Sequence, residues 1–150
     1  MKRLLVVQHT PTDNLGSIAD AVLAGARHPD LEGVEVQVLP ALEAGIDDVL
    51  AADGYLLGTP ANFGYISGAM KHFFDTVYDH VREETAKRPF SYWIHGGYDT
   101  TGAERAMEQI TTGLGWTLVA EPLVFTGEVT ADRLEAATEL GGTVAARVAG

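Results

Sequence analysis

The chain has 150 residues, a length typical of one domain, and 46% of them are hydrophobic, enough for a full core. It contains no cysteine, which excludes a disulfide scaffold, a thiol nucleophile and a metal centre bound by cysteine. The formal net charge of −11 argues against nucleic acid as a partner, because contacts to phosphates require clustered lysine and arginine. An acidic surface favours solubility, and it can also steer a basic redox partner.

The N-terminal segment is basic and then apolar, which superficially resembles a signal peptide. Its apolar run is too short, and no cleavage site with small residues follows it. No other stretch reaches the ~18 apolar residues of a membrane span. We therefore expect a buried first strand and no membrane partner, and the absence of cysteine fits a cytoplasmic protein.

The first half of the chain predicts two strands and two helices. Residues 4–7 form a continuous apolar run, which is typical of a buried strand. Apolar residues then recur at helical spacing over 15–26, and Pro29 fits the end of that helix. Valines alternate with polar residues over 34–38, as in a strand at the edge of a sheet, and residues 46–50 predict a short helix.

The middle of the chain continues the alternation. Residues 54–59 predict a second buried strand. An apolar helical stripe covers 66–77, and an aromatic-rich strand is expected over 90–94.

The last third predicts a helix, a strand and a closing helix. Thr101 and Glu104 have the spacing of a capping box at the start of the first helix. Residues 117–125 predict a strand that Pro122 bends or interrupts, because proline has no N–H for the sheet. The closing helix begins near residue 131.

Strict alternation of five strands and five helices predicts an α/β fold in which residues 1–150 form one domain. The expected architecture is a three-layer αβα sandwich around a five-stranded parallel sheet. Ligands of such sheets bind outside the carboxyl ends of the strands. The loops after the first, third and fourth strands are therefore the candidate site.

The first of these loops, residues 9–15, joins a buried strand to the start of a helix. The hydroxyls of Thr10 and Thr12, the amide of Asn14 and the free N–H groups of the first helical turn can all donate to a phosphate. The alternative is a purely structural role, because threonine, aspartate and asparagine also cap helices.

The other two loops can bind a flat ring. In residues 58–68, Phe63 can supply an aromatic wall and Gly64 lets the main chain approach closely. The alternative is a helix-entry loop with a core phenylalanine. After the fourth strand, Gly96 and Gly97 can turn backbone N–H groups toward a ligand. The neighbouring residues leave choices open: Tyr98 can stack on a ring or lie on the surface, and His95 can bind a ligand or be a satisfied histidine at a strand end.

On these residues the chain resembles the flavodoxin-like superfamily. Thr10, Thr12 and Asn14 match the FMN phosphate loop of flavodoxins. Two positions depart from that pattern: Asp13 stands where flavodoxins usually have glycine, and Leu15 where they usually have threonine. The charge of Asp13 is unfavourable beside a phosphate unless its side chain points away.

The sharpest resemblance is to the FMN and quinone reductase branch of the superfamily. It covers residues 58–75, and residues 95–99 resemble the glycine-rich loop beside the pyrimidine end of the flavin. The resemblance implies strand order 2-1-3-4-5 and FMN as cofactor. It assigns cofactor binding to Thr10, Thr12, Asp13, Asn14, Leu15, Pro60, Ala61, Asn62, Phe63, Gly64, His95, Gly96, Gly97, Tyr98 and Asp99.

The implied function is an FMN-dependent NAD(P)H oxidoreductase that reduces a flavin or a quinone. Its partners would be NAD(P)H and a small-molecule acceptor or a redox protein, in an oligomeric state left open. Two alternatives are a flavodoxin-type electron carrier and an interaction scaffold without FMN. No catalytic side chain is assigned, because the flavin carries the hydride or electrons. The five histidines lack metal-ligand spacing, so no metal site is predicted.

Overall fold

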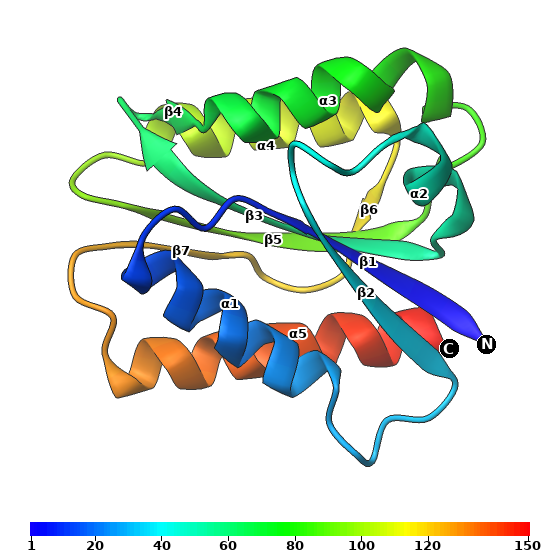
Figure 1. The fold of residues 1–150 in the computed structure, drawn as a ribbon, viewed down its shortest axis with the longest axis horizontal. Helices are drawn as coiled ribbons and strands as arrows, with labels where there is room; N and C mark the ends of the chain where they lie inside the picture. Colours follow the sequence, from blue (N-terminus) through cyan, green and yellow to red (C-terminus); the bar gives the residue numbers. More distant parts are fainter.

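The computed structural model describes residues 1–150, which alternate between strands and helices (Figure 1). The strands are β1 (Lys2–Gln8), β2 (Val34–Pro40), β3 (Gly54–Asn62), β4 (Tyr65–Ile66), β5 (Pro89–Gly96), β6 (Thr117–Leu118) and β7 (Leu123–Thr126). The helices are α1 (Asp13–Ala26), α2 (Ile46–Ala51), α3 (Gly68–Val81), α4 (Thr101–Leu114) and α5 (Ala131–Ala149). None of these helices combines the length and apolar composition needed to cross a bilayer.

The sheet has the central order β2-β1-β3-β5-β6, and β7 continues the edge beyond β6 by pairing with β5. All of these pairs are parallel. Because β6 and β7 are two pieces of the predicted fifth strand, the order 2-1-3-4-5 is confirmed. The predicted interruption is also confirmed: Val119 still donates its N–H to the carbonyl of Phe90 at 3.0 Å, but residues 120–122 leave the ladder, and they end at Pro122, which has no N–H to donate.

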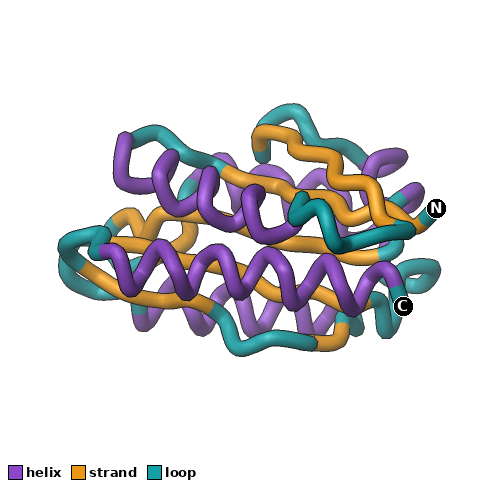
Figure 2. The backbone as a smooth tube through the Cα atoms, turned by 90° about the horizontal axis from the view of Figure 1, so that it is seen from below, coloured by secondary structure: helices purple, strands orange, loops and turns teal.

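Helices cover both faces of the sheet, which confirms the three-layer sandwich. In Figure 1, α1 and α5 lie below the sheet, and α3 and α4 lie above it. In Figure 2, α5 ends at the C-terminus and runs along the length of the strands. The coverage explains the unbroken apolar run of β1, in which Leu4, Leu5, Val6 and Val7 are all fully buried. Alternate residues of the central strands enter two separate apolar clusters, one under each helical layer.

The expected loop after residue 59 is instead a hairpin. β3 continues to Asn62, and β4 turns back to pair with it antiparallel. The two residues between the strands, Phe63 and Gly64, both have positive φ angles, of 51° and 76°. Two-residue turns of this kind match the twist of the strands, and they favour asparagine, aspartate and glycine. The phenylalanine at the first turn position hid the hairpin from the sequence pattern.

The start of α4 differs from the predicted capping box by one residue. The N-cap is Thr100, and its hydroxyl donates to the Glu104 carboxylate at 3.0 Å. The first free N–H of the helix, that of Thr101, donates to Oδ1 of Asp99 at 3.0 Å. An aspartate two residues before the N–H it accepts forms an Asx turn, and this turn caps the helix in place of the Thr101 hydroxyl.

Candidate functional site

The three predicted loops meet at the carboxyl edge of the sheet, on the left side of Figure 1. The last residue of β1, Gln8, is paired with Gly58 of β3, and Ala61 of β3 is paired with Gly96 of β5. The N–H of His9, the first residue of the first loop, donates to the carbonyl of Gly58 at 2.9 Å. Residues up to 90 positions apart thus come together at one edge, as parallel strands require.

The first loop combines a helix cap with unused donors. Oγ1 of Thr12 accepts the N–H of Leu15 at 3.3 Å, so the capping alternative is realised. The N–H groups of Asp13 and Asn14 have no acceptor within the protein. Both residues are exposed. The amino end of a 14-residue helix carries a partial positive charge, so this turn can bind an anion although no lysine or arginine lies in the loop.

The hairpin places an aromatic side chain in the solvent. Phe63 is 100% exposed, and its left-handed backbone conformation is costly for a bulky residue without a compensating role. Tyr65 and Tyr98 are also exposed, by 42% and 84%. A Cβ atom on Gly102 would collide with the carbonyl of Gly64, so the start of α4 packs directly on the hairpin turn. The arrangement offers aromatic surface to a planar ligand.

The two glycines of the third loop differ in the space around them: Gly97 is open to solvent, and Gly96 is packed against β3. A Cβ atom on Gly97 would meet nothing within 4 Å, whereas one on Gly96 would lie 2.9 Å from the Cβ of Ala61. The hydrogen bonds from the Thr101 backbone and side chain lower the pKa of the Asp99 carboxyl. Asp99 therefore carries its negative charge at the tip of this loop at neutral pH, beside Gly64.

His95 is engaged inside the protein. Its Nε2 donates to the carbonyl of Gly127 at 2.7 Å, and its ring meets Phe125 edge to face at 4.8 Å between centroids. Only 7% of the residue is exposed. These contacts match the alternative of a satisfied histidine at a strand end, and a contact between His95 and a cofactor stays a prediction.

Three buried polar atoms near this edge were not among the predicted residues. Oε1 of Gln8, Nδ1 of His9 and Nε1 of Trp93 have no hydrogen-bond partner within the protein. Native proteins rarely leave buried polar groups unpaired, and a bound ligand is one way of satisfying them. For Gln8 and His9 a signal was present in the sequence, because two polar residues directly follow an apolar strand.

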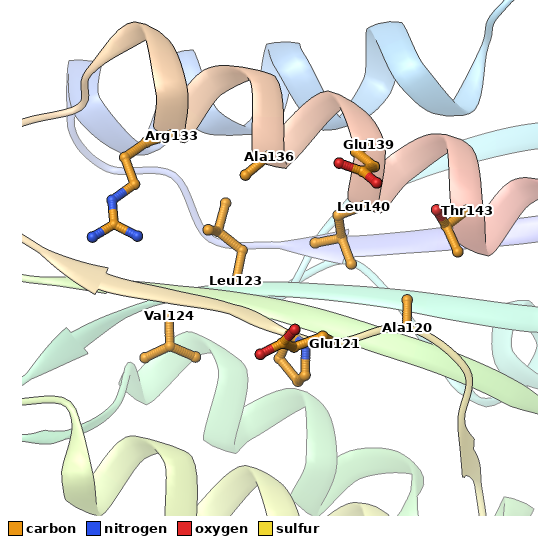
Figure 3. A pocket seen from close by; sticks show the side chains of 10 residues that line it. Ala120, Glu121, Leu123, Val124, Arg133, Ala136, Glu139, Leu140 and Thr143 are labelled. Atoms are coloured by element: carbon orange, nitrogen blue, oxygen red, sulfur yellow. The ribbon is translucent and has the colours of Figure 1, made fainter.

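A groove of about 480 Å³ lies elsewhere, between β7 and α5 (Figure 3). Leu123 and Leu140 face each other across it, and Arg133 lies at one end with its guanidinium 4.7 Å from the Phe125 ring centroid. Its lining includes the carboxylates of Glu121 and Glu139, which disfavour an anionic ligand. None of the predicted cofactor residues lines this groove.

The sequence profile of the family described as NADPH-dependent FMN reductase matches residues 15–131, which is more than three quarters of the chain. The chain belongs to this family. Membership indicates FMN as the cofactor, as the resemblance implied. The residues at the carboxyl edge fit this cofactor: the unused N–H groups of α1 suit a phosphate, and the exposed aromatic residues suit a flavin ring.

Two curated relatives point in the same direction. A flavodoxin of Aquifex aeolicus is 46% identical over 77 residues, which cover 51% of this chain and 40% of the relative. An NAD(P)H dehydrogenase (quinone) of Acidithiobacillus ferrooxidans is 29% identical over 125 residues, which cover 67% of this chain and 62% of the relative. The chain thus spans between two fifths and three fifths of the length of these relatives.

Solved structures share the fold over the whole chain. An archaeal flavodoxin superposes with a TM-score of 0.83 at 19% identity and covers 99% of both chains. A flavodoxin, WrbA-like protein from Agrobacterium tumefaciens reaches 0.78 at 22% identity, over 99% of this chain and 98% of the other. The predicted flavodoxin-like fold is therefore confirmed.

Proposed function

We propose that the chain binds FMN at the carboxyl edge of its sheet and uses it to transfer electrons from NAD(P)H to a flavin or quinone acceptor. The observation that carries the proposal is Phe63, a fully exposed aromatic residue held at a positive φ angle. It belongs to the same edge as the unused N–H groups of α1. Family membership and the quinone dehydrogenase relative support the same reaction class.

The phosphate end of FMN would lie at the start of α1. The N–H groups of Asp13 and Asn14 donate to the phosphate oxygens, and the hydroxyls of Thr10 and Thr12 add two further donors. Leu15 lies in the same turn but would not donate to the phosphate, because its N–H is already bonded to Oγ1 of Thr12. The exposed position of Asp13 lets its carboxylate remain in water, away from the phosphate.

The ring end would lie between the hairpin and the third loop. Phe63 and Tyr98 shield the faces of the ring, and the open backbone at Gly97 can donate to its pyrimidine edge. The backbone of Pro60, Ala61, Asn62 and Gly64 shapes the wall from the side of β3. FMN supplies the hydride and electron chemistry when it is bound, and the protein positions it, so no side chain is given a catalytic role.

The reductase activity is tested by anaerobic stopped-flow reduction of the FMN-loaded chain with NADH and with NADPH. We expect the flavin absorbance to bleach at least about tenfold faster than for free FMN, because a bound ring is oriented for hydride transfer. The ratio of the two rates gives the preferred nucleotide. Bleaching at the rate of free FMN with both nucleotides would overturn the reductase proposal.

A second candidate is an electron carrier, which the 46% identity to a flavodoxin over half of the chain favours. A carrier would pass electrons to a redox protein, and the net charge of −11 suits a basic partner. Reductive titration separates the two candidates, since reduction in two resolved one-electron steps supports the carrier and direct two-electron reduction supports the reductase. The cytoplasmic location stays a prediction in both cases.

A further inference from the structure

One row of residues crosses the sheet directly under the first loop. Gln8 of β1, Gly58 of β3 and Trp93 of β5 are consecutive partners in the parallel register. Gly58 also accepts the N–H of His9, which is the first bond of the loop toward α1. The row therefore marks the point where β1 ends and the proposed phosphate loop begins.

Trp93 brings a buried donor without an acceptor to this row. The residue is fully buried, and its Nε1 has no partner within the protein. A Cβ atom on Gly58 would collide with the Cε2 and Cζ2 atoms of the indole, so the ring fills the space that a side chain on Gly58 would occupy. Since Cε2 is bonded to Nε1, the unpaired N–H lies beside Gly58. Leaving such a group unpaired is costly.

The face of the sheet on which Trp93 lies is the face that α1 covers. Trp93 shares its apolar cluster with Ile18 and Val22 of α1. The helix begins five residues after the end of β1, so its first turn stands above the carboxyl end of the row. The unused N–H groups of Asp13 and Asn14 are on that turn. Free donors of the helix and a free donor of the sheet thus lie on the same side of the sheet, at the end of β1.

We propose that the indole N–H of Trp93 is a buried donor to the phosphate of bound FMN, completing the ring of donors at the start of α1. The proposal rests on the proposed function and names a residue of the phosphate site outside the loop itself. It explains why a fully buried tryptophan keeps an unpaired N–H.

Gln8 is placed to act beside Trp93. Leu4 and Val6 of the same strand enter the cluster under α1, so alternation points Gln8 to that face as well. Its buried Oε1 has no partner. Rotation of the amide by a half turn exchanges oxygen for nitrogen and turns an acceptor into a second donor. Gln8 and Trp93 then flank Gly58 as a pair of neutral donors, in a site without lysine or arginine.

The indole N–H resonances of the full chain test the contact directly. The chain has two tryptophans, and Nε1 of the other, Trp116, already donates to Oγ1 of Thr85 at 2.9 Å. We expect the Trp93 N–H proton to move downfield with FMN bound relative to riboflavin bound, while that of Trp116 stays in place. Trp93→Phe and Trp116→Phe assign the two signals. Equal Trp93 shifts with FMN and riboflavin would overturn the proposal, because riboflavin lacks the phosphate.

Binding constants provide a second test. Losing a hydrogen bond to a charged group should weaken FMN binding to Trp93→Phe by about 10- to 100-fold. Riboflavin binding should change by less than about threefold, and Trp116→Phe should bind FMN like the wild type. Equal weakening for both flavins, or none for FMN, would show that Trp93 does not contact the phosphate. If wild-type chain binds neither flavin, the proposed function itself has failed.

Discussion

The amino ends and the carboxyl ends of the strands form opposite edges of the sheet, and buried polar groups at these two edges differ in their hydrogen bonding. The two tryptophans show the difference. At the amino edge, Trp116 stacks on Tyr55 at 4.0 Å between ring centroids, and its Nε1 is bonded to Thr85. At the carboxyl edge, Trp93 is equally enclosed but its Nε1 has no partner. The indole N–H of a tryptophan thus has a hydrogen-bond acceptor within the protein at the amino edge and none at the carboxyl edge.

Arg88 ties the amino edge together. Its Nη1 donates to the carbonyls of Leu50 and Ala52 at 3.0 and 2.8 Å, and to the hydroxyl of Tyr55 at 3.2 Å. That hydroxyl in turn donates to the carbonyl of Val49 at 2.6 Å. The difference indicates that the two edges have different roles. Hydrogen bonds at the amino edge stabilise the fold, and the carboxyl edge has free donors and exposed aromatic surface that can bind a ligand.

The largest expected effect on stability comes from Arg88→Met. It leaves two carbonyls and one hydroxyl without their charged donor, which should cost about 3 kcal/mol of unfolding free energy. Urea denaturation at neutral pH measures the loss. FMN affinity should stay within about twofold of the wild type. A large loss of FMN affinity in the folded variant would contradict the different roles of the two edges.

Phe63→Ala should show the reverse pattern. Because the side chain is fully exposed, the melting temperature of the flavin-free chain should not fall. Losing an aromatic contact to the ring should weaken FMN and riboflavin binding alike, by roughly tenfold. Fluorescence quenching of each flavin gives the two constants. Leu42→Ala, which removes another exposed apolar side chain, is the matched control.

Asp13→Asn should strengthen FMN binding by about two- to fivefold, since it removes a negative charge from the turn that faces the phosphate. Riboflavin binding should not change. The gain should shrink at high salt, which screens exposed charges. The flavin-free variant should be slightly less stable, because an acidic residue in the first turn stabilises a helix. Calorimetric titration at low and high salt measures the affinities, and an unchanged FMN affinity at low salt would show that the phosphate does not bind at this turn.

The smallest effect concerns the acid stability of the third loop. The bonds from Thr101 lower the pKa of Asp99 below its ordinary value of 3.8. A lowered pKa in the folded state contributes stability that is present above the unfolded pKa and is lost as the pH falls through the folded one. The melting temperature of the wild type should therefore exceed that of Asp99→Ala by a constant margin above about pH 5, and the margin should shrink as the pH falls below 3.8 and through the lowered pKa of the folded state. A margin that persists in acid would rule out this cap.

Some elements were predictable because their signals are local. The apolar run of β1 and the helical stripe of α3 reflect burial on one or both faces, and they identify strands and helices without knowledge of the rest. Ser67 is a further local signal, because serine is a common helix cap, and the N–H of Met70 donates to its hydroxyl at 3.1 Å at the start of α3. The hairpin at Phe63 was missed because its turn lacks the residues that usually announce one.

The sequence by itself determined the alternation of elements, and hence the parallel sheet, the edge that gathers the loops and the resemblance to FMN-binding proteins. Only the tertiary structure decided which polar atoms find partners. Whether Trp93, Trp116 or His95 is satisfied depends on residues about 30 or more positions away that register and packing bring alongside. Hydrogen bonding between distant segments is set by geometry in space, which spacing along the chain does not encode.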